Sequence, residues 1–504
     1  MEIEIELKFI FNAKFIDDLH HTLSNFDCIS SKTQFLHNVY FDSAARCLRK
    51  LEMGLRVRTC EGKSVQTIKT AGRVIGGLHQ RPEYNEPIEG LRPELARFKR
   101  EIWPKNCDIQ QLQQDLTPIF STDFERQAWL IEMPDDTLIE VAYDNGFIET
   151  NQGKMALCEI ELELVKGDEK QLFILGDKIA QLPSVRLGNV SKAQRGYMLA
   201  DNATFQVKPL SNSTITENLS IPQALLLNMQ HGIKQIQYHE NCYIEGQQIE
   251  ALKELLQGVK FIHQNIILFK GELNNLNQAP WLEDLHWLAR SFSWLDEYFI
   301  QTRLLDNKSY YLRKLSKPKT MINKIKKQKN ALPGSDAIIA LLTSTRYCQF
   351  ILTFTQWLIQ EEKNTFSEGK TNNITTFSQT ILDNSWGKIS TALQDSEHLS
   401  VQQFLACQGM LESNLLTDLS LGHLFSKQKI DIFHSHWLDI QQGLNEFSLL
   451  NLMTEMTQDE KNIELQNEYF KWIKRKENTL LHALQQSKQQ VLLKAQYWKA
   501  EKKG

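Results

Sequence analysis

A strict alternation of charged and apolar residues at the start of the chain restricts its fold more than any other feature. Glu4, Glu6 and Lys8 share one parity, whereas Ile5 and Leu7 share the other. Successive side chains of a β-strand point to opposite faces, so this segment predicts a strand with one charged and one apolar face. The same alternation returns at three later places, which are residues 55–58, 139–144 and 159–164.

These predicted strands concentrate charge of one sign on one face. Residues 159–164 place three carboxylates on a single face, and residues 55–58 place two arginines on a single face. Like charges repel unless groups of opposite sign lie close by, and exposed cross-strand pairs contribute only about 0.2 to 1 kcal/mol each. We therefore predict a closed antiparallel β-barrel with a charged lumen and apolar outer faces covered by helices. An open antiparallel sheet with its charged face in water is the alternative.

The two signs of charge indicate what such a lumen would bind. Carboxylates are the ligands that Mg2+ and Mn2+ prefer, and both ions commonly bridge to substrate phosphates. Arginine offers a planar fork that matches phosphate oxygens, and lysine supplies a point charge. The pattern therefore predicts a metal–phosphate complex inside the barrel, which is the arrangement of a phosphoryl-transfer site.

The chain changes character near residue 210. Strand-like alternation and most prolines lie before that point, and the remainder consists of long segments with helical periodicity. We predict an α+β domain at residues 1–205, built on an antiparallel β-barrel flanked by helices, then a linker at 206–218 and an all-α helical bundle at 219–504. The lysine-rich stretch 314–334, which contains Pro318 and Pro333, is predicted to connect two halves of the bundle.

Composition restricts the setting in which the protein works. Hydrophobic residues make up 41% of the chain and charged residues 23%, as in ordinary globular proteins. The acidic N-terminus does not resemble a signal peptide, and no apolar run reaches the length of a membrane span. The eight cysteines form no CxxC pair, and the net charge of −4 does not indicate a nucleic-acid binder. We expect a soluble, cytoplasmic protein that binds neither nucleic acid nor membrane.

A series of short motifs accompanies the predicted strands in order along the chain. The motifs are Glu4-Ile5-Glu6-Leu7-Lys8, Tyr40-Phe41-Asp42, Leu55-Arg56-Val57-Arg58, Thr67-Ile68-Lys69-Thr70, Arg81-Pro82-Glu83, Arg126, Asp144-Asn145-Gly146, Glu159-Ile160-Glu161 and Ser191-Lys192-Ala193. The first motif resembles the ExExK signature of the CYTH superfamily, the triphosphate tunnel metalloenzymes. The ordered set resembles that family over the whole first domain.

The resemblance implies roles for the residues of the predicted lumen. The implied metal ligands are the carboxylates Glu4, Glu6, Asp144, Glu159, Glu161 and Glu163. The implied contacts to a triphosphate are the basic residues Lys8, Arg56, Arg58, Lys69, Arg81, Arg126 and Lys192. Catalysis is implied for Glu4, Glu6, Lys8, Arg56, Arg58, Lys69, Arg126 and Lys192.

The resemblance also implies a cofactor. Mg2+ or Mn2+ is expected, with two ions when substrate is bound; one neutralises phosphate oxygens and the other lowers the pKa of the attacking water. Some residues have a plainer alternative. Asp144 could belong to an Asp-Asn-Gly turn, and Arg81 and Glu83 could form a surface ion pair.

The helical half resembles a CHAD domain in its position after the barrel and in fragments such as Gln237-Tyr238-His239-Glu240 and Trp437-Leu438-Asp439. This domain order resembles bacterial inorganic triphosphatases, so we expect metal-dependent hydrolysis of inorganic triphosphate to pyrophosphate and phosphate. The alternatives are hydrolysis of thiamine triphosphate or a nucleoside triphosphate, and a non-catalytic protein that binds polyphosphate.

The basic helix of CHAD domains, which is thought to bind polyphosphate, has a reduced counterpart in this chain. The corresponding run is residues 249–263, and it keeps only Lys253, Lys260 and His263 as basic residues. A polyphosphate contact of the helical domain would rest on these three side chains.

Overall fold

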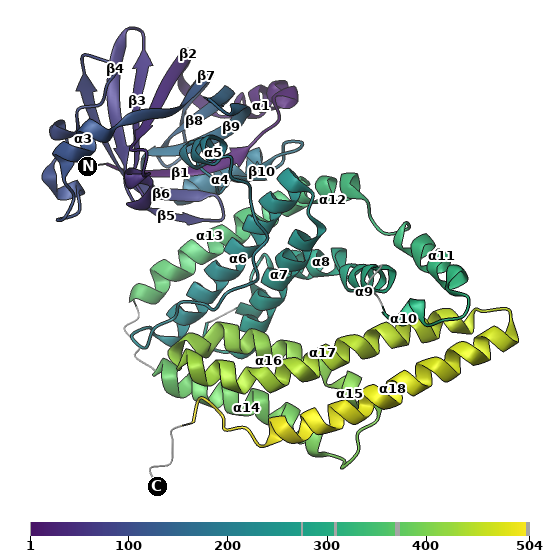
Figure 1. Cartoon of the computed structure of the whole chain (residues 1–504). Coiled ribbons are helices and arrows are strands. Elements are labelled where there is room, and N and C mark those ends of the chain that lie inside the picture. Colours follow the sequence, from purple (N-terminus) through teal and green to yellow (C-terminus); the bar gives the residue numbers. More distant parts are fainter. Residues whose placement is uncertain (1, 274–275, 307–309, 368–372, 500–504) are drawn as a thin grey trace. The chain divides into compact units, whose positions relative to one another are not determined.

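The computed structural model describes residues 2–273, 276–306, 310–367 and 373–499 (Figure 1). The chain divides into two compact units. The first unit consists of Met1–Gln206, Glu240–Gln247 and Asp336–Gln360, and the second consists of Val207–His239, Gln248–Ser335 and Glu361–Gly504. Two short segments of the helical half therefore belong to the same unit as the N-terminal strands.

The first unit is built on a closed antiparallel β-barrel. Its eight strands follow the order β1, β9, β8, β7, β2, β3, β4 and β6, and β6 pairs again with β1. The short strands β5 and β10 extend the sheet by pairing with β6 and β1. The strands are β1 (Glu2–Ile10), β2 (Asp27–Asp42), β3 (Gly54–Cys60), β4 (Lys63–Lys69), β5 (Arg73–Ile75), β6 (Leu78–Ile88), β7 (Thr117–Glu132), β8 (Leu138–Thr150), β9 (Gly153–Lys166) and β10 (Arg186–Leu187). The predicted barrel is confirmed, and the open-sheet alternative is wrong because the β1–β6 pairing closes the sheet.

The two faces of β1 have the predicted polarity. Glu6 and Lys8 are buried inside the barrel, and Leu7 and Phe9 are fully buried on its outside. Helix α4 (Lys170–Ile179) covers this outer face so closely that a Cβ atom on Gly176 would lie 2.7 Å from Cδ2 of Leu7. A glycine at this position therefore allows the helix to pack directly on the strand.

Other short helices complete the first unit. They are α1 (Ile16–Leu23), α2 (Cys47–Lys50), α3 (Ile109–Asp115), α5 (Lys192–Ala200) and the 3-10 turns at Ala13–Phe15, Leu95–Arg97 and Arg100–Ile102. Helix α5 begins at Lys192 because the Ser191 side chain accepts a hydrogen bond from the backbone N–H of Gln194, a standard N-cap. The helical half contributes the end of α6 (Ile221–Gly246), α12 (Ser335–Leu342) and most of α13 (Thr345–Ser367).

The second unit is helical. Its remaining helices are α7 (Ile249–Leu268), α8 (Leu282–Ser291), α9 (Leu295–Leu305), α10 (Tyr310–Arg313), α11 (Pro318–Lys329), α14 (Ile374–Gln394), α15 (Val401–Ala406), α16 (Gln408–Leu421), α17 (Lys427–Gln458) and α18 (Ile463–Leu492), with 3-10 turns at Leu276–Gln278 and Gly422–Leu424. Their core includes the fully buried rings of Trp386 and Trp437, whose centroids lie 4.7 Å apart.

The lysine-rich stretch is a helix and not only a connection. Pro318 occupies the first turn of α11, where the missing N–H costs nothing. Met321 and Ile325 are buried one helical turn apart, so the lysines occupy the remaining faces. In α7, the ammonium group of Lys260 lies 3.7 Å from a carboxylate oxygen of Glu412. One of the few positive charges of this helix is therefore paired with a carboxylate.

Within the described ranges, no single helix has both the length and the apolar character needed to cross a membrane. Helices α12 and α13, which are bent by 41° relative to each other, meet that measure only as a pair.

Candidate active site

The strand register places the predicted site residues around one lumen. Directly opposite residues of an antiparallel pair lie on the same face of the sheet. Glu4 pairs with Arg81, and Lys8 pairs with Glu161. Arg126 of β7 pairs with Asp144 of β8. The lumen is a cavity of about 640 Å3. Its lining includes Glu4, Glu6, Lys8, Arg56, Arg58, Lys69, Arg81, Arg126, Glu161, Glu163 and Lys192.

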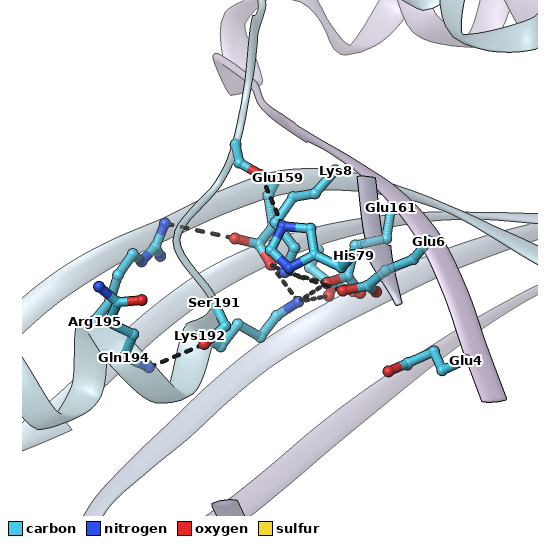
Figure 2. A network of polar contacts seen from close by, with 12 residues as sticks. Glu4, Glu6, Lys8, His79, Glu159, Glu161, Ser191, Lys192, Gln194 and Arg195 are labelled. Atoms are coloured by element: carbon cyan, nitrogen blue, oxygen red, sulfur yellow. Dashed lines mark hydrogen bonds and ion pairs between the residues drawn. The ribbon is translucent and has the colours of Figure 1, made fainter. Parts of the chain in front are cut away.

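Three buried carboxylates come together in the site, and of these Glu161 is the one that lines the cavity. One oxygen each of Asp144, Glu159 and Glu161 lies within 4.8 Å of the other two, and Asp144 and Glu159 are fully buried. The ammonium group of Lys192 contacts all three: its Nζ lies 2.7 Å from Asp144 and 2.9 Å from Glu161, and it also pairs with Glu159. Lys8 donates to Glu161 at 2.6 Å and to Glu159 at 3.1 Å. Figure 2 shows both lysines converging on Glu159 and Glu161.

The charges of this carboxylate triad and its cations stabilise one another. Burial by itself would raise the pKa of Glu161, but Lys192, Lys8 and Arg126 hold that pKa well below its usual range. The pKa of Asp144 is also lowered: burial by itself would raise it, but Arg126 and Lys192 outweigh this effect. Burial would lower the pKa of Lys8, yet Glu159 and Glu161 raise it well above its ordinary value. Glu161, Asp144 and Lys8 are therefore charged near neutral pH.

The carboxylate triad is suited to a divalent cation. It offers hard oxygen donors from Asp144, Glu159 and Glu161 within a short span, which is the donor set that Mg2+ and Mn2+ prefer. The triad also already holds a positive charge, the ammonium of Lys192, at its centre. Glu4 and Glu6 lie on the neighbouring strand β1, and Glu4 is engaged with Lys69 at 2.6 Å.

A second charged group lies on the wall formed by β1, β4, β6 and β3. Lys69 lies 3.0 Å from Glu83 in addition to its contact with Glu4, and Arg56 lies 3.6 Å from Glu83. Burial would raise the pKa of Glu83, but Lys69 and Arg56 lower it to about 2. The Arg81–Glu83 surface pair considered above is wrong, because both residues line the lumen and Glu83 pairs with Lys69 and Arg56.

Guanidinium groups on this side have unused hydrogen-bonding capacity. The buried Nε atoms of Arg56 and Arg81 have no hydrogen-bond partner among the described residues. Arg58 donates from Nε to Asn38 at 2.8 Å, and burial beside Arg56 and Arg126 lowers its pKa to about 9. Buried cations that repel one another favour an anionic ligand between them.

Glu163 differs from the other lumen carboxylates. It pairs in register with Glu6 and Glu140, so its nearest strand neighbours are acidic. Burial and the charge of Glu4 raise its pKa to about 7. Glu163 therefore gains or loses a proton near neutral pH.

The turn alternative for Asp144 is wrong. Asp144 lies in the middle of β8, where Arg126 donates to both of its oxygens at 2.7 Å. Gly146, two residues on, faces Phe124 so closely that a Cβ atom would lie 2.5 Å from the Cα of Phe124. The glycine of this motif thus serves the close approach of two strands instead of a turn.

The structure adds one residue that sequence reasoning missed, His79. His79 pairs in register with Glu6 and is buried in the lumen wall. Its Nε2 lies 2.9 Å from the carbonyl oxygen of Gly188, and its Nδ1 accepts a hydrogen bond from Arg81 at 3.1 Å. Burial lowers the pKa of His79 to about 4, so the ring is neutral and Nε2–H is the donor. Its shared parity with Arg81 and Glu83 was the signal that could have found it.

Comparison with known proteins adds two domain matches. Residues 2–197 match the family model of the CYTH domain, and residues 228–455 match that of the CHAD domain. An inorganic triphosphatase of Haemophilus influenzae is 38% identical over 198 residues, which are 39% of this chain and 54% of that protein. The chain therefore spans about half the length of that curated relative.

Two solved structures are also similar to parts of the chain. One is a candidate adenylyl cyclase from Hippeastrum with a dominant triphosphatase activity. Its sequence is 20% identical, the match covers 40% of this chain and 97% of the Hippeastrum chain, and the TM-score is 0.31. The other is the CHAD domain of the plant Ricinus communis, which is 15% identical, covers 58% of this chain and 99% of its own, and has a TM-score of 0.43.

Proposed function

Because the chain carries a CYTH domain followed by a CHAD domain, we propose that its barrel is the active site of a divalent-metal-dependent inorganic triphosphatase. The reaction adds water to triphosphate and yields pyrophosphate and phosphate. One observation supports the proposal above all: the closed barrel holds a buried carboxylate triad, whose Glu161 lines the lumen next to a wall of guanidinium and ammonium groups. The relative from Haemophilus influenzae, which is similar over the barrel half, is named for the same activity.

The carboxylates would hold the cation. Asp144, Glu159 and Glu161 supply the buried donor set, and Glu4, Glu6 and Glu163 extend it along the lumen. Bound Mg2+ or Mn2+ would neutralise phosphate oxygens and could lower the pKa of a coordinated water. We expect two ions in the substrate complex.

The basic residues would bind and orient the triphosphate. Arg56 and Arg81 each present a buried N–H without a partner among the described residues, and Arg58 lies on the same wall. Lys8, Lys69, Arg126 and Lys192 now pair with carboxylates and would turn part of their hydrogen bonds to phosphate oxygens. Such preorganised cations stabilise the charge that develops on the leaving pyrophosphate oxygen.

The test is phosphate release by the full chain from four substrates: inorganic triphosphate, thiamine triphosphate, ATP and long-chain polyphosphate. Each would be assayed with Mg2+, with Mn2+ and with EDTA, for the wild type and for Glu6→Gln. We expect fast, metal-dependent release from inorganic triphosphate that Glu6→Gln loses while its fold persists. Faster turnover of thiamine triphosphate or ATP than of inorganic triphosphate would contradict the proposal. The absence of phosphate release from all four substrates would also contradict it.

A further inference from the structure

The segment 186–192 connects the barrel wall to the lumen. It begins with β10, whose Leu187 pairs with Phe9 of β1, and it ends at Lys192, whose ammonium lies among the carboxylates. The backbone N–H of Gly188 donates to the carbonyl oxygen of Lys8 at 2.9 Å. From the inside, His79 lies 2.9 Å from the Gly188 carbonyl oxygen. The backbone position of this segment therefore determines where the Lys192 side chain starts.

On its outer side, the same segment is held by residues of the helical half. Glu240 and Asn241, near the end of α6, both accept hydrogen bonds from Nη1 of Arg186 at 2.9 Å. The side-chain amide of Asn241 also donates to Asn189 at 3.0 Å. All of these residues belong to the first compact unit, so the contacts lie within one body.

Helix α13 supports Glu240 from behind. The Tyr347 hydroxyl donates to the second oxygen of Glu240 at 2.8 Å. Glu240 and Tyr347 are almost completely buried, and burial raises the pKa of Glu240 despite its contacts with Arg186 and Tyr347. A buried carboxylate that is held on both oxygens has little freedom to reorient, because each lost bond would leave a buried polar atom unsatisfied.

The same helix approaches the barrel beside this segment. A Cβ atom on Gly76, in the turn before β6, would lie 1.7 Å from Oγ1 of Thr355, so the helix packs directly on that turn. The next residue, Gly77, accepts the hydrogen bond of the Lys8 backbone N–H at 2.9 Å. A Cβ atom on Gly77 would lie 2.7 Å from Cδ2 of Leu187. Helix α13 thus contacts the turn that adjoins both β1 and β10.

From this geometry we propose that Glu240, Asn241 and Tyr347 are positioning residues for Lys192, acting through Arg186, Asn189 and the segment 186–192. The helical half thereby contributes directly to the binding of triphosphate in the barrel. This inference rests on the proposed function, because it takes Lys192 to be a contact of triphosphate.

The test compares two single changes on helix α13 of the full chain. Tyr347→Phe removes the hydroxyl that supports Glu240, and Gln349→Leu removes a hydrogen bond of 3.1 Å from the same helix to Asp177 on α4, a residue outside the segment 186–192. We expect Tyr347→Phe to raise the KM for triphosphate about three- to tenfold with a smaller change in kcat, a change of the size by which residues of a packed network modulate coupling between sites. We expect Gln349→Leu to leave the KM unchanged.

A double change separates positioning from general loss of stability. In a Lys192→Gln background, Tyr347→Phe should add no further increase in KM, because the side chain through which it acts is gone. Glu240→Gln, which keeps the volume but removes the charge that holds Arg186, should reproduce the effect of Tyr347→Phe. An undiminished effect of Tyr347→Phe without Lys192 would overturn the inference.

A readout without turnover makes the inference independent of the proposed activity. Hydrogen exchange of peptides that cover residues 186–200 should be faster in Tyr347→Phe than in the wild type, and unchanged in Gln349→Leu. Equal exchange in all three proteins refutes the positioning role, whatever the barrel hydrolyses. Faster exchange in Tyr347→Phe, in a protein whose wild type releases no phosphate, would refute the proposed function and support the positioning of Lys192.

Discussion

Removing the ammonium of Lys192 is the sharpest test of the charge arrangement in the lumen. In Lys192→Met, the carboxylates of Asp144, Glu159 and Glu161 lose a cation that now contacts all three. Breaking a buried ion pair by removing one partner costs about 3 to 5 kcal/mol, because the remaining charge stays buried. Lys8 and Arg126 still neutralise part of the cluster, so we expect a loss of about 3 kcal/mol, at the lower end of that range.

Native-state hydrogen exchange of strand β9 would measure this loss, because it reports the opening free energy of the barrel separately from the helical unit. The measurement would be made at pH 7.5 in EDTA and then with increasing Mn2+. A ligand that binds only the folded state stabilises it by about 2.7 kcal/mol at a concentration of 100 Kd. We therefore expect Mn2+ to restore most of the lost stability, since the carboxylate triad would exchange an ammonium for a metal ion.

Arg195→Met provides the matched control. Arg195 lies on the same helix and reaches Glu159 by a single contact of 3.5 Å, so its removal should cost less than the removal of Lys192, which contacts all three carboxylates. An equal loss in the two variants would show that the destabilisation does not come from the uncompensated carboxylates. A loss in Lys192→Met that Mn2+ leaves unchanged would refute the assignment of the triad as a cation site.

Three further predictions follow from single residues. Burial and Glu4 raise the pKa of Glu163 from 4.5 to about 7, so the folded state keeps a proton that the unfolded state loses, and stability falls as the pH rises between these values. Glu163→Gln should therefore be more stable than the wild type above pH 7 in EDTA and equal to it below pH 4.5, as thermal unfolding across that pH range would show. His79→Leu removes the side chain that contacts the Gly188 carbonyl oxygen and Arg81. The change should lower the stability of the barrel by about 1 to 3 kcal/mol and raise the KM for triphosphate. In the same kinetic assay, His79→Gln should restore part of the wild-type KM. Gly176→Ala should cost about 1 to 3 kcal/mol, measured by hydrogen exchange of β1, because its Cβ would lie 2.7 Å from Leu7; an unchanged exchange rate would mean that the packing of α4 adjusts freely.

Much of the barrel could be read from the sequence because strand periodicity is local. The alternation of Glu4, Glu6 and Lys8 with Leu7 and Phe9 requires only that successive side chains point to opposite faces, and the structure places the two sets accordingly. Closure was predicted from charge, because unlike charges had to lie close together. Which strands close the barrel could not be predicted, because the pairing between β1 and β6 depends on a register that no local sequence pattern states.

The site shows the same division between local and tertiary information. Lys69 could be predicted as a site residue only because the segment 67–70 resembles a family motif. In the structure, its contacts with Glu4 and Glu83 explain why it belongs to the site. His79 was missed because its shared parity with Arg81 and Glu83 indicates a site residue only once β6 is known to face the lumen. Its importance comes from its partners, Gly188 and Arg81, of which Gly188 lies more than a hundred residues away in the chain.

The sequence by itself determined the polarity of the strands, the charged lumen and the change to helices, because these depend on the residue types and their spacing. Only the tertiary structure decided that Lys192 lies within the carboxylate triad, since that contact joins a helix terminus to three strand residues. It likewise decided that Glu240 and Tyr347, from the helical half, belong to the same compact unit as the barrel. Contacts of this kind depend on which distant segments pack together, and local periodicity does not state that.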